Sequence, residues 1–248
     1  MTVEHATSGI RLATFNIKHG APADKYRGEP ELAAAACAEL NADILALQEV
    51  DKGVPRSRRA DLAALAAKAS GMEVVFARTM WFHGGRYGNA LLVRGEISDL
   101  EILSLKGDHR HRIRIGGRQF LIGREPRNAI LATARLEEGE VSVAATHLST
   151  DRQVSRRQLT EVMAALACRQ TPQVLMGDLN LSRTSVSKHP SIESMDLAEA
   201  PPTFPSTNPR KSIDHIAVNG LIIQSTEAVK FPISDHLALI ANVSIPKT

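Results

Sequence analysis

Residues 174–180 read VLMGDLN, a short apolar run that ends in the carboxylate of Asp178 and the amide of Asn180. A short apolar run bounded by turn residues is typical of a strand buried in a sheet. Polar side chains directly after such a strand stand at the edge of the sheet, where the strand fixes their positions and a ligand can reach them. The stretch therefore predicts a covered strand that presents two oxygen-bearing side chains.

The same pattern recurs along the whole chain. Asn16 lies near the end of a strand predicted at 10–17, Glu49 near the end of one at 43–50, and His147 at the end of one at 141–147. Asp214 interrupts the apolar run 213–218, and Asp235 and His236 immediately precede a last strand at 237–245. Taken singly, each of these residues is explained by a turn or a solvated strand end. Their combination predicts one site at the end of a sheet.

Other short apolar or alternating runs predict further strands, and apolar residues at helical spacing predict helices. The further strands are expected at 74–77, 90–94, 97–105, 112–115, 129–136, 174–176 and 222–229. The helices are expected to carry stripes at Leu32, Ala36 and Leu40 behind Pro30, at Leu62, Leu65, Ala66 and Ala69 before Gly71, and at Leu159, Val162, Met163 and Leu166 within 154–168. Because some strands alternate with helices and others follow each other directly, we expect mixed sheets covered by helices.

Turn residues and composition complete the expected organisation. Glu138-Gly139 and Asn219-Gly220 are expected to close two hairpins, and the Pro-rich run 201–209 is expected to be a loop beside the site. Neither a repeat nor a shift of composition divides the chain, so residues 1–248 are expected to form a single domain.

Length and charge exclude several classes of protein. The 248 residues are 43% hydrophobic and 23% charged, which excludes collagenous, coiled-coil and disordered chains. Cys37 and Cys168 lie in Ala- and Leu-rich stretches and are expected to be buried free thiols. With no apolar window of about 18 residues and no leader pattern, we expect a cytoplasmic protein without integral membrane association. The sequence leaves the oligomeric state open, with a monomer favoured. The net charge of +3 permits a polyanionic partner without requiring one.

The residue types at the strand ends share one chemistry. Glu49, Asp178, Asn180, Asp235 and the amide of Asn16 are hard oxygen donors, which suit Mg²⁺ or Mn²⁺. The sequence lacks the cysteine cluster of a structural zinc site. A hard divalent cation with few protein ligands is the usual partner of a phosphate ester, because it neutralises oxygens that gain charge in the transition state.

Seven motifs, in this order, resemble the endonuclease/exonuclease/phosphatase family, the metal-dependent phosphodiesterases related to pancreatic deoxyribonuclease. They are TFNI (14–17), LQEVD (47–51), YGNALL (87–92), THLS (146–149), MGDLN (176–180), SIDHI (212–216) and SDH (234–236). The resemblance covers about residues 10–245 and implies an α/β fold, a four-layer αββα sandwich of two mixed, mostly antiparallel sheets. It also implies a metal-dependent hydrolase of phosphoester bonds.

The resemblance implies roles for the strand-end residues. Glu49 is similar to the principal metal-binding glutamate, with Asn16 beside it and Asp235 flanking the metal region. Asp178 and Asn180 resemble the pair that orients or deprotonates the attacking water and contacts the phosphate. His236 resembles the catalytic histidine, Asp214 the aspartate that supports it, and His147 the second histidine of the deoxyribonuclease and sphingomyelinase branches.

A less obvious match lies at residues 124–127, REPR. This run resembles the segment that supplies a glutamate paired with the second histidine, so Glu125 is expected to bind His147 and raise its basicity. A solvated strand end explains the same run equally well.

Departures from the family pattern and local charge bear on the substrate. Lys18 stands where the abasic-site branches carry an aspartate, which disfavours abasic-site repair. The basic strip at 106–127 suits a phosphate backbone, but a solvated basic hairpin is slightly favoured, because the strip has only Phe120 for stacking on bases. We expect a phosphodiesterase or nuclease acting on a phosphoester, nucleic acid among the candidates. The alternatives are a sphingomyelinase-like lipid or small-molecule phosphodiesterase or phosphatase, and a non-catalytic polyanion-binding relative.

Overall fold

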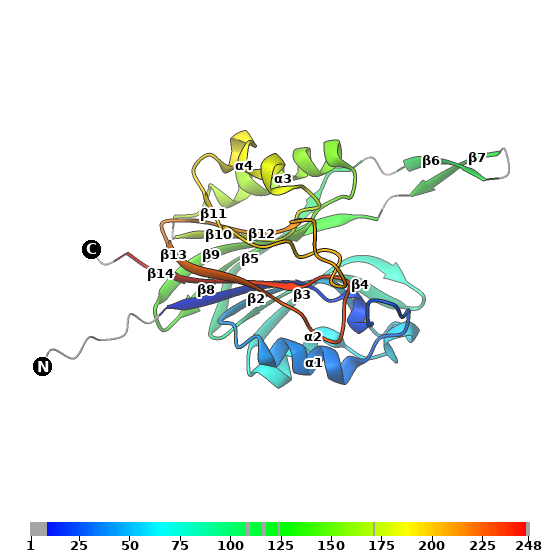
Figure 1. Ribbon diagram of the computed structural model, residues 1–248, viewed down its shortest axis with the longest axis horizontal. Helices are drawn as coiled ribbons and strands as arrows, with labels where there is room; N and C mark the ends of the chain where they lie inside the picture. The colour runs from blue at the N-terminus through cyan, green and yellow to red at the C-terminus, as the bar shows by residue number, and fades with distance from the viewer. Residues whose placement is uncertain (1–8, 108–109, 116–117, 124, 171, 247–248) are drawn as a thin grey trace, which may run out of the picture.

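The computed structural model describes residues 9–107, 110–115, 118–123, 125–170 and 172–246. Two six-stranded sheets pack face to face, α1 and α2 cover the outer face of one sheet, and α3 and α4 cover the other (Figure 1). The expected four-layer αββα sandwich is therefore confirmed. None of the described helices combines the length and apolar character that a membrane crossing requires.

The order of the strands within each sheet differs from their order along the chain. The first sheet runs β13 (Ile222–Val229), β14 (Ala238–Ser244), β1 (Ile10–Asn16), β2 (Ile44–Lys52), β4 (Gly85–Val93) and β3 (Glu73–Phe82). The second runs β11 (Asp196–Leu197), β12 (Asp214–Asn219), β10 (Gln173–Asp178), β9 (Gly139–His147), β8 (Arg127–Leu136) and β5 (Glu96–Leu105). The helices are α1 (Pro30–Glu39), α2 (Leu62–Ser70), α3 (Arg152–Leu166) and α4 (Arg183–Ser187), with 3-10 turns at Lys18–Gly20, Pro55–Ser57 and Pro190–Ile192.

One parallel pair in each sheet positions the site. β1 and β2 run parallel and are joined through α1, and β9 and β10 run parallel and are joined through α3. Parallel neighbours end at the same edge of a sheet, so Asn16 lies beside Gln48 and His147 beside Asp178. The antiparallel neighbours β14 and β12 begin at these same edges, which brings Asp214 opposite Asp178.

The core lies between the sheets and under the helices. Leu12 and Leu91 of the first sheet share a fully buried cluster with Ile130 and Val174 of the second. Along α3 the four predicted apolar residues are buried against the second sheet, as expected for an amphipathic helix. Burial on both faces explains why the central strands are continuous apolar runs.

Three predictions about side-chain burial were wrong. Leu32 is 44% exposed, because α1 turns Ala33 and not Leu32 toward the sheet, although the other two residues of the predicted stripe are buried. Ala69, at the end of the stripe predicted on α2, is exposed as well. Cys37 is a buried free thiol as expected, but Cys168 is exposed, since it lies beyond the end of α3 rather than within its buried stripe.

One predicted hairpin was also wrong. The turn at Glu138 joins β8 to its partner β9 as expected. The turn at Asn219-Gly220 instead carries the chain from β12 in one sheet to β13 in the other. A positive φ of 75° at Gly220 makes the sharp turn, but a turn residue does not specify which strand the chain pairs with next.

The chain segment that connects β5 to β8 forms a two-stranded ribbon, which projects from the sandwich (Figure 1). It consists of β6 (Arg110–Ile115) and β7 (Arg118–Gly123), of which only the first was predicted. The basic strip falls largely on this ribbon, and its side chains there lie outside the described part of the structure.

We predict that Gly177→Ala strongly destabilises the protein. A Cβ at Gly177 would lie 2.0 Å from the carbonyl oxygen of Thr146, so β10 would have to move away from β9. We expect a loss of about 1–3 kcal/mol or more in the free energy of unfolding, measured by urea denaturation. Gly71→Ala is the matched control, because Gly71 also has a positive φ, 66°, but its Cβ would meet nothing within 4 Å. Equal losses in the two variants would contradict the steric argument.

Candidate active site

The strand ends of both sheets border a cavity of about 910 Å³. Its lining includes most of the predicted site residues, namely Asn16, Glu49, Glu125, His147, Asp178, Asn180, Asp235 and His236. Asp214 is fully buried and hydrogen-bonds His236. Phe204, from the predicted Pro-rich loop, also lines the cavity, and its ring centroid lies 4.8 Å from that of His236. The structure therefore brings the predicted residues together at one place.

Asp178 lies at the centre of this site and is only 2% exposed. Its Oδ1 accepts a hydrogen bond from the backbone N–H of Asn180 at 3.0 Å, and its Oδ2 accepts one from Nδ2 of Asn16 at 3.2 Å. The Nε2 atoms of His147 and His236 lie 3.5 and 3.8 Å from the same Oδ2. Burial, followed by the nearby charge of Asp214, raises the pKa of Asp178 to about 7.

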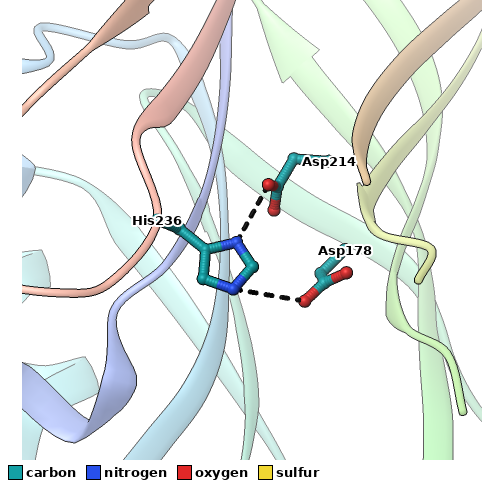
Figure 2. Close-up of side chains that lie close together, drawn as sticks. All are labelled: Asp178, Asp214 and His236. Atoms are coloured by element: carbon teal, nitrogen blue, oxygen red, sulfur yellow. Dashed lines mark hydrogen bonds and ion pairs between the residues drawn. The ribbon is translucent and has the colours of Figure 1, made fainter. Parts of the chain in front are cut away.

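His236 lies between two carboxylates (Figure 2). Its Nδ1 donates to Oδ2 of Asp214 at 2.9 Å, and the hydroxyl of Thr203 donates to that same oxygen. Burial alone would lower the pKa of His236, but Asp214 and then Asp178 outweigh it and raise the pKa to about 10. The imidazole is therefore held as a buried cation that faces Asp178 through Nε2.

Glu49 reaches the cavity because its strand is irregular. The pairing of β2 with β4 shifts register between Leu47 and Val50, and Glu49 has a φ of 57°. Such a bulge redirects a side chain, at a backbone cost of about 1–3 kcal/mol. Oε1 of Glu49 accepts from Nδ2 of Asn16 at 3.1 Å, so one amide group binds the carboxylates of both Glu49 and Asp178.

Two further residues at the site have left-handed backbone conformations. Asn180 has a φ of 50°, and its Nδ2 donates to the carbonyl of Leu148 at 3.1 Å. Ser234 has a φ of 69°; its hydroxyl donates to the carbonyl of Asn16 and accepts the N–H of His236 at 3.0 Å. These hydrogen bonds fix the loops that carry the site, which is how strained conformations persist in a native structure.

The residues present fit a hard divalent cation. Glu49 and Asp178 approach each other closely enough to share one amide, and carboxylate oxygens are the ligands that Mg²⁺ and Mn²⁺ prefer. Asn16 turns its Nδ2 toward both carboxylates, while its Oδ1 accepts the N–H of Lys18, so ligation through Oδ1 requires the amide to rotate. Asp235 lines the same cavity.

A second group has metal-binding spacing. One ligand atom from each of Asp178, Asp214 and His236 lies within 4.8 Å of the others. However, both ring nitrogens of His236 face carboxylates, and its raised pKa favours the form in which both carry protons. A protonated imidazole cannot bind a metal, so this trio is better suited to proton transfer, and the cation fits better between Glu49 and Asp178.

The expected direct pair of Glu125 and His147 was wrong, because Arg127 lies between them. Nη1 of Arg127 donates to Oε1 of Glu125 and to Nδ1 of His147, both at 2.8 Å. Burial and then the charge of Arg127 lower the pKa of His147 well below its ordinary value. Glu125 itself is only partly buried, and burial raises its pKa despite Arg127 and a hydrogen bond with Tyr87.

From the sequence, Arg127 was placed only in the basic strip and in the run REPR, with no role in the site. A signal was present, because Arg127 and Glu125 are two residues apart and side chains at that spacing share one face of an extended chain. Three other basic residues that line the cavity were also missed, namely Arg183, Arg210 and Lys211. They lie in a short helix and a loop, where no periodicity indicates which side chains face inward.

The fold and the site together define a class, that of αββα sandwich proteins with carboxylates and imidazoles gathered at one sheet edge. The chain belongs to the Endonuclease/Exonuclease/phosphatase family, whose model matches residues 13–236. Members of this family are typically phosphoester hydrolases and generally depend on a divalent metal.

Solved structures resemble the chain closely in fold. An endonuclease/exonuclease/phosphatase from Beutenbergia cavernae is 21% identical with a TM-score of 0.74, over 96% of this chain and 72% of that one. The human nocturnin catalytic domain is 19% identical with a TM-score of 0.68, over 97% and 96%. A mannosyl-6-phosphatase from Bacteroides thetaiotaomicron is 14% identical with a TM-score of 0.70, over 95% and 100%. No curated protein sequence matches the chain. At these identities the likeness shows the fold alone.

We predict that the stability of the metal-free protein falls as pH rises from 7.5 to 9. In this window folded His236, with its pKa near 10, keeps a proton that the unfolded chain, with an ordinary pKa of 6.5, has lost. Its stabilising contribution is therefore complete below about pH 6.5 and lost toward pH 10, with a slope of up to about 1.4 kcal/mol per pH unit. Urea denaturation at several pH values measures this slope of the free energy of unfolding against pH.

The variant His236→Gln should lose most of this slope, whereas His83→Gln, a change on an exposed turn, should keep it. Smaller slopes from Asp178, with a pKa of about 7, near pH 7.5 and from Cys37, whose burial raises the thiol pKa from 9.0 to about 12, near pH 9 should remain in both variants. An equal slope in His236→Gln and the unmodified protein would show that His236 is not a cation in the fold.

Proposed function

We propose that this protein is a Mg²⁺- or Mn²⁺-dependent hydrolase of phosphoester bonds, and a phosphodiesterase or nuclease in particular. The observation that carries the proposal is the position of Asp178. Its Oδ2 is buried where an amide that also binds Glu49 meets two histidines whose pKa values are shifted in opposite directions, down for His147 by burial and Arg127 and up for His236 by Asp214. Residues suited to bind a metal and residues suited to transfer a proton thus meet at one carboxylate, an arrangement that suits hydrolysis at phosphorus.

The chain's own residues supply the proton chemistry. When bound, the cation supplies charge neutralisation at the phosphoryl oxygens and lowers the pKa of water. Asp178, whose carboxylate accepts the N–H of Asn180 at the edge of the cavity, is suited by its position to accept the proton of an attacking water, and Asn180 beside it to orient that water. His236, a cation supported by Asp214, is suited to donate a proton to the leaving oxygen.

The remaining lining favours an anionic substrate. Arg183, Arg210 and Lys211 border the cavity beside the carboxylates, where they suit the negative oxygens of a phosphate ester. Lys211 also lies 5.7 Å from the ring centroid of Phe204. A lipid or small-molecule phosphodiester and a phosphomonoester remain alternative substrates. A non-catalytic polyanion-binding relative is disfavoured, because clustered buried carboxylates repel polyanions and destabilise a fold that does not use them.

We predict strict dependence on a divalent cation. Removal of metal by a chelator should abolish hydrolysis, and Mg²⁺ or Mn²⁺ should restore it, because the carboxylates alone repel an anionic substrate. The measurement is a panel of plasmid DNA, single-stranded DNA, RNA, sphingomyelin, inositol phosphates, a sugar phosphate and a nitrophenyl phosphodiester. Cleavage of the nucleic acids supports a nuclease, cleavage of another member alone supports an alternative, and full activity in excess chelator refutes the metal-dependent proposal.

We predict that Glu49→Gln separates metal binding from folding. Loss of a group that only supports a ligand costs about 10- to 100-fold in metal affinity, so loss of the ligand charge itself should cost at least about 100-fold. The metal-free variant should be at least as stable as the parent, because repulsion with Asp178 is relieved. Titration calorimetry and urea denaturation measure the two effects. The control is Glu39→Gln on the exposed side of α1, which should change neither.

A further inference from the structure

Arg127 is buried at the start of β8, 8% exposed, next to the second histidine of the site. One nitrogen, Nη1, contacts both Oε1 of Glu125 and Nδ1 of His147 at 2.8 Å. The guanidinium carries only donors and stays protonated at any pH at which the protein is folded. Nδ1 of His147 must therefore accept the hydrogen bond, which requires that it carry no proton.

We propose that Arg127 is a positioning residue that fixes His147 in the neutral tautomer protonated at Nε2, so that this imidazole serves the reaction as a hydrogen-bond donor and not as a proton-transfer acid. A neutral imidazole has one donor and one acceptor nitrogen, so an acceptor at Nδ1 places the proton on Nε2. A second proton, on Nδ1, would point at the guanidinium cation. The contact with Arg127 therefore selects one of the three protonation states.

The proton on Nε2 points toward the reaction. Nε2 of His147 lies 3.5 Å from Oδ2 of Asp178, and His147 lines the cavity. An N–H at this place is suited to donate to a phosphoryl oxygen as its charge increases in the transition state. This catalytic consequence rests on the proposed function, whereas the tautomer itself rests on the hydrogen bond alone.

The two histidines are thereby given different tasks. His236 donates through Nδ1 to the carboxylate of Asp214, which favours additional charge on its ring. His147 accepts at Nδ1 from the guanidinium of Arg127, which opposes additional charge. Two imidazoles that face the same oxygen of Asp178 thus differ in the partner behind them, a cation for one and an anion for the other.

Glu125 acquires a new role in this arrangement. Its carboxylate binds Nη1 of Arg127 and also forms a hydrogen bond with Tyr87. A buried guanidinium requires such an anionic partner, because an uncompensated buried charge is strongly destabilising. Glu125 therefore acts on His147 through Arg127, with the opposite effect on the imidazole from that of a directly bound carboxylate.

The experiment is nitrogen NMR of the imidazole rings in the metal-free, substrate-free protein at pH 7, with uniform ¹⁵N labelling. His147 is one of nine histidines, and its signals are assigned by their loss in His147→Gln. We expect Nδ1 of His147 to show the shift of an unprotonated nitrogen and Nε2 that of a protonated one. A proton on Nδ1, whether in the other tautomer or in an imidazolium, overturns the proposal without any variant of Arg127.

Two variants of Arg127 test the cause. Arg127→Met keeps an unbranched but shorter side chain and removes its donors, so Nδ1 should become partly protonated, and turnover on the substrate found active should fall about 10- to 100-fold. In Arg127→Lys, the side chain is one bond shorter but still ends in a cationic donor, Nζ, that can bind both Glu125 and His147, so Nδ1 should stay unprotonated. An unchanged spectrum in Arg127→Met, or a proton on Nδ1 in folded Arg127→Lys, overturns the assignment of the tautomer to the Arg127 hydrogen bond.

The same design separates this proposal from the proposed function. If none of the phosphoesters is cleaved but the tautomer is as expected, the proposed function fails and the role of Arg127 in fixing His147 stands. If hydrolysis is observed with His147 protonated at Nδ1, the hydrolase stands and the role of Arg127 fails.

Discussion

The burial of one carboxylate, that of Asp178, constrains the whole site. A charge removed from water is costly unless it is hydrogen-bonded or paired, and Asp178 is 2% exposed. Its two oxygens therefore need Asn180, Asn16 and the ring nitrogens of His147 and His236 around them. These partners come from both sheets and from the loop before β14. The topology is what makes this possible, since a parallel pair in each sheet ends at the same place.

Much of this arrangement could be predicted from the sequence, because strand ends are marked by a change from apolar to polar residues. That change located Asn16, Glu49, His147 and Asp178, all of which line the cavity. The apolar runs also predicted mixed sheets under helices. Periodicity is a local signal, and it is reliable for the long, regular elements such as α3.

The sequence did not indicate which strands or side chains that lie far apart along the chain would pair with each other in the fold. The turn at Gly220 could be predicted from its residues. Which sheet the next strand joins depends on which of all the strands offers it the best pairing. The bulge that turns Glu49 into the site arises from the pairing of β2 with β4. The same holds for the polar side chains of Glu125, Arg127 and His147. Which of them bind each other depends on their exact positions in the folded chain, where Arg127 binds both of the others.

The hydrogen bond of Asn16 to Asp178 joins two layers of the sandwich, because β1 and β10 belong to different sheets. Anything bound between Glu49 and Asp178 is likewise held only while the layers are packed. Its binding free energy therefore adds to the cohesion of the sandwich, through the linkage that makes any ligand of the native state a stabiliser. Separation of the layers would end binding and chemistry together, so the occupied site also reports that the fold is intact.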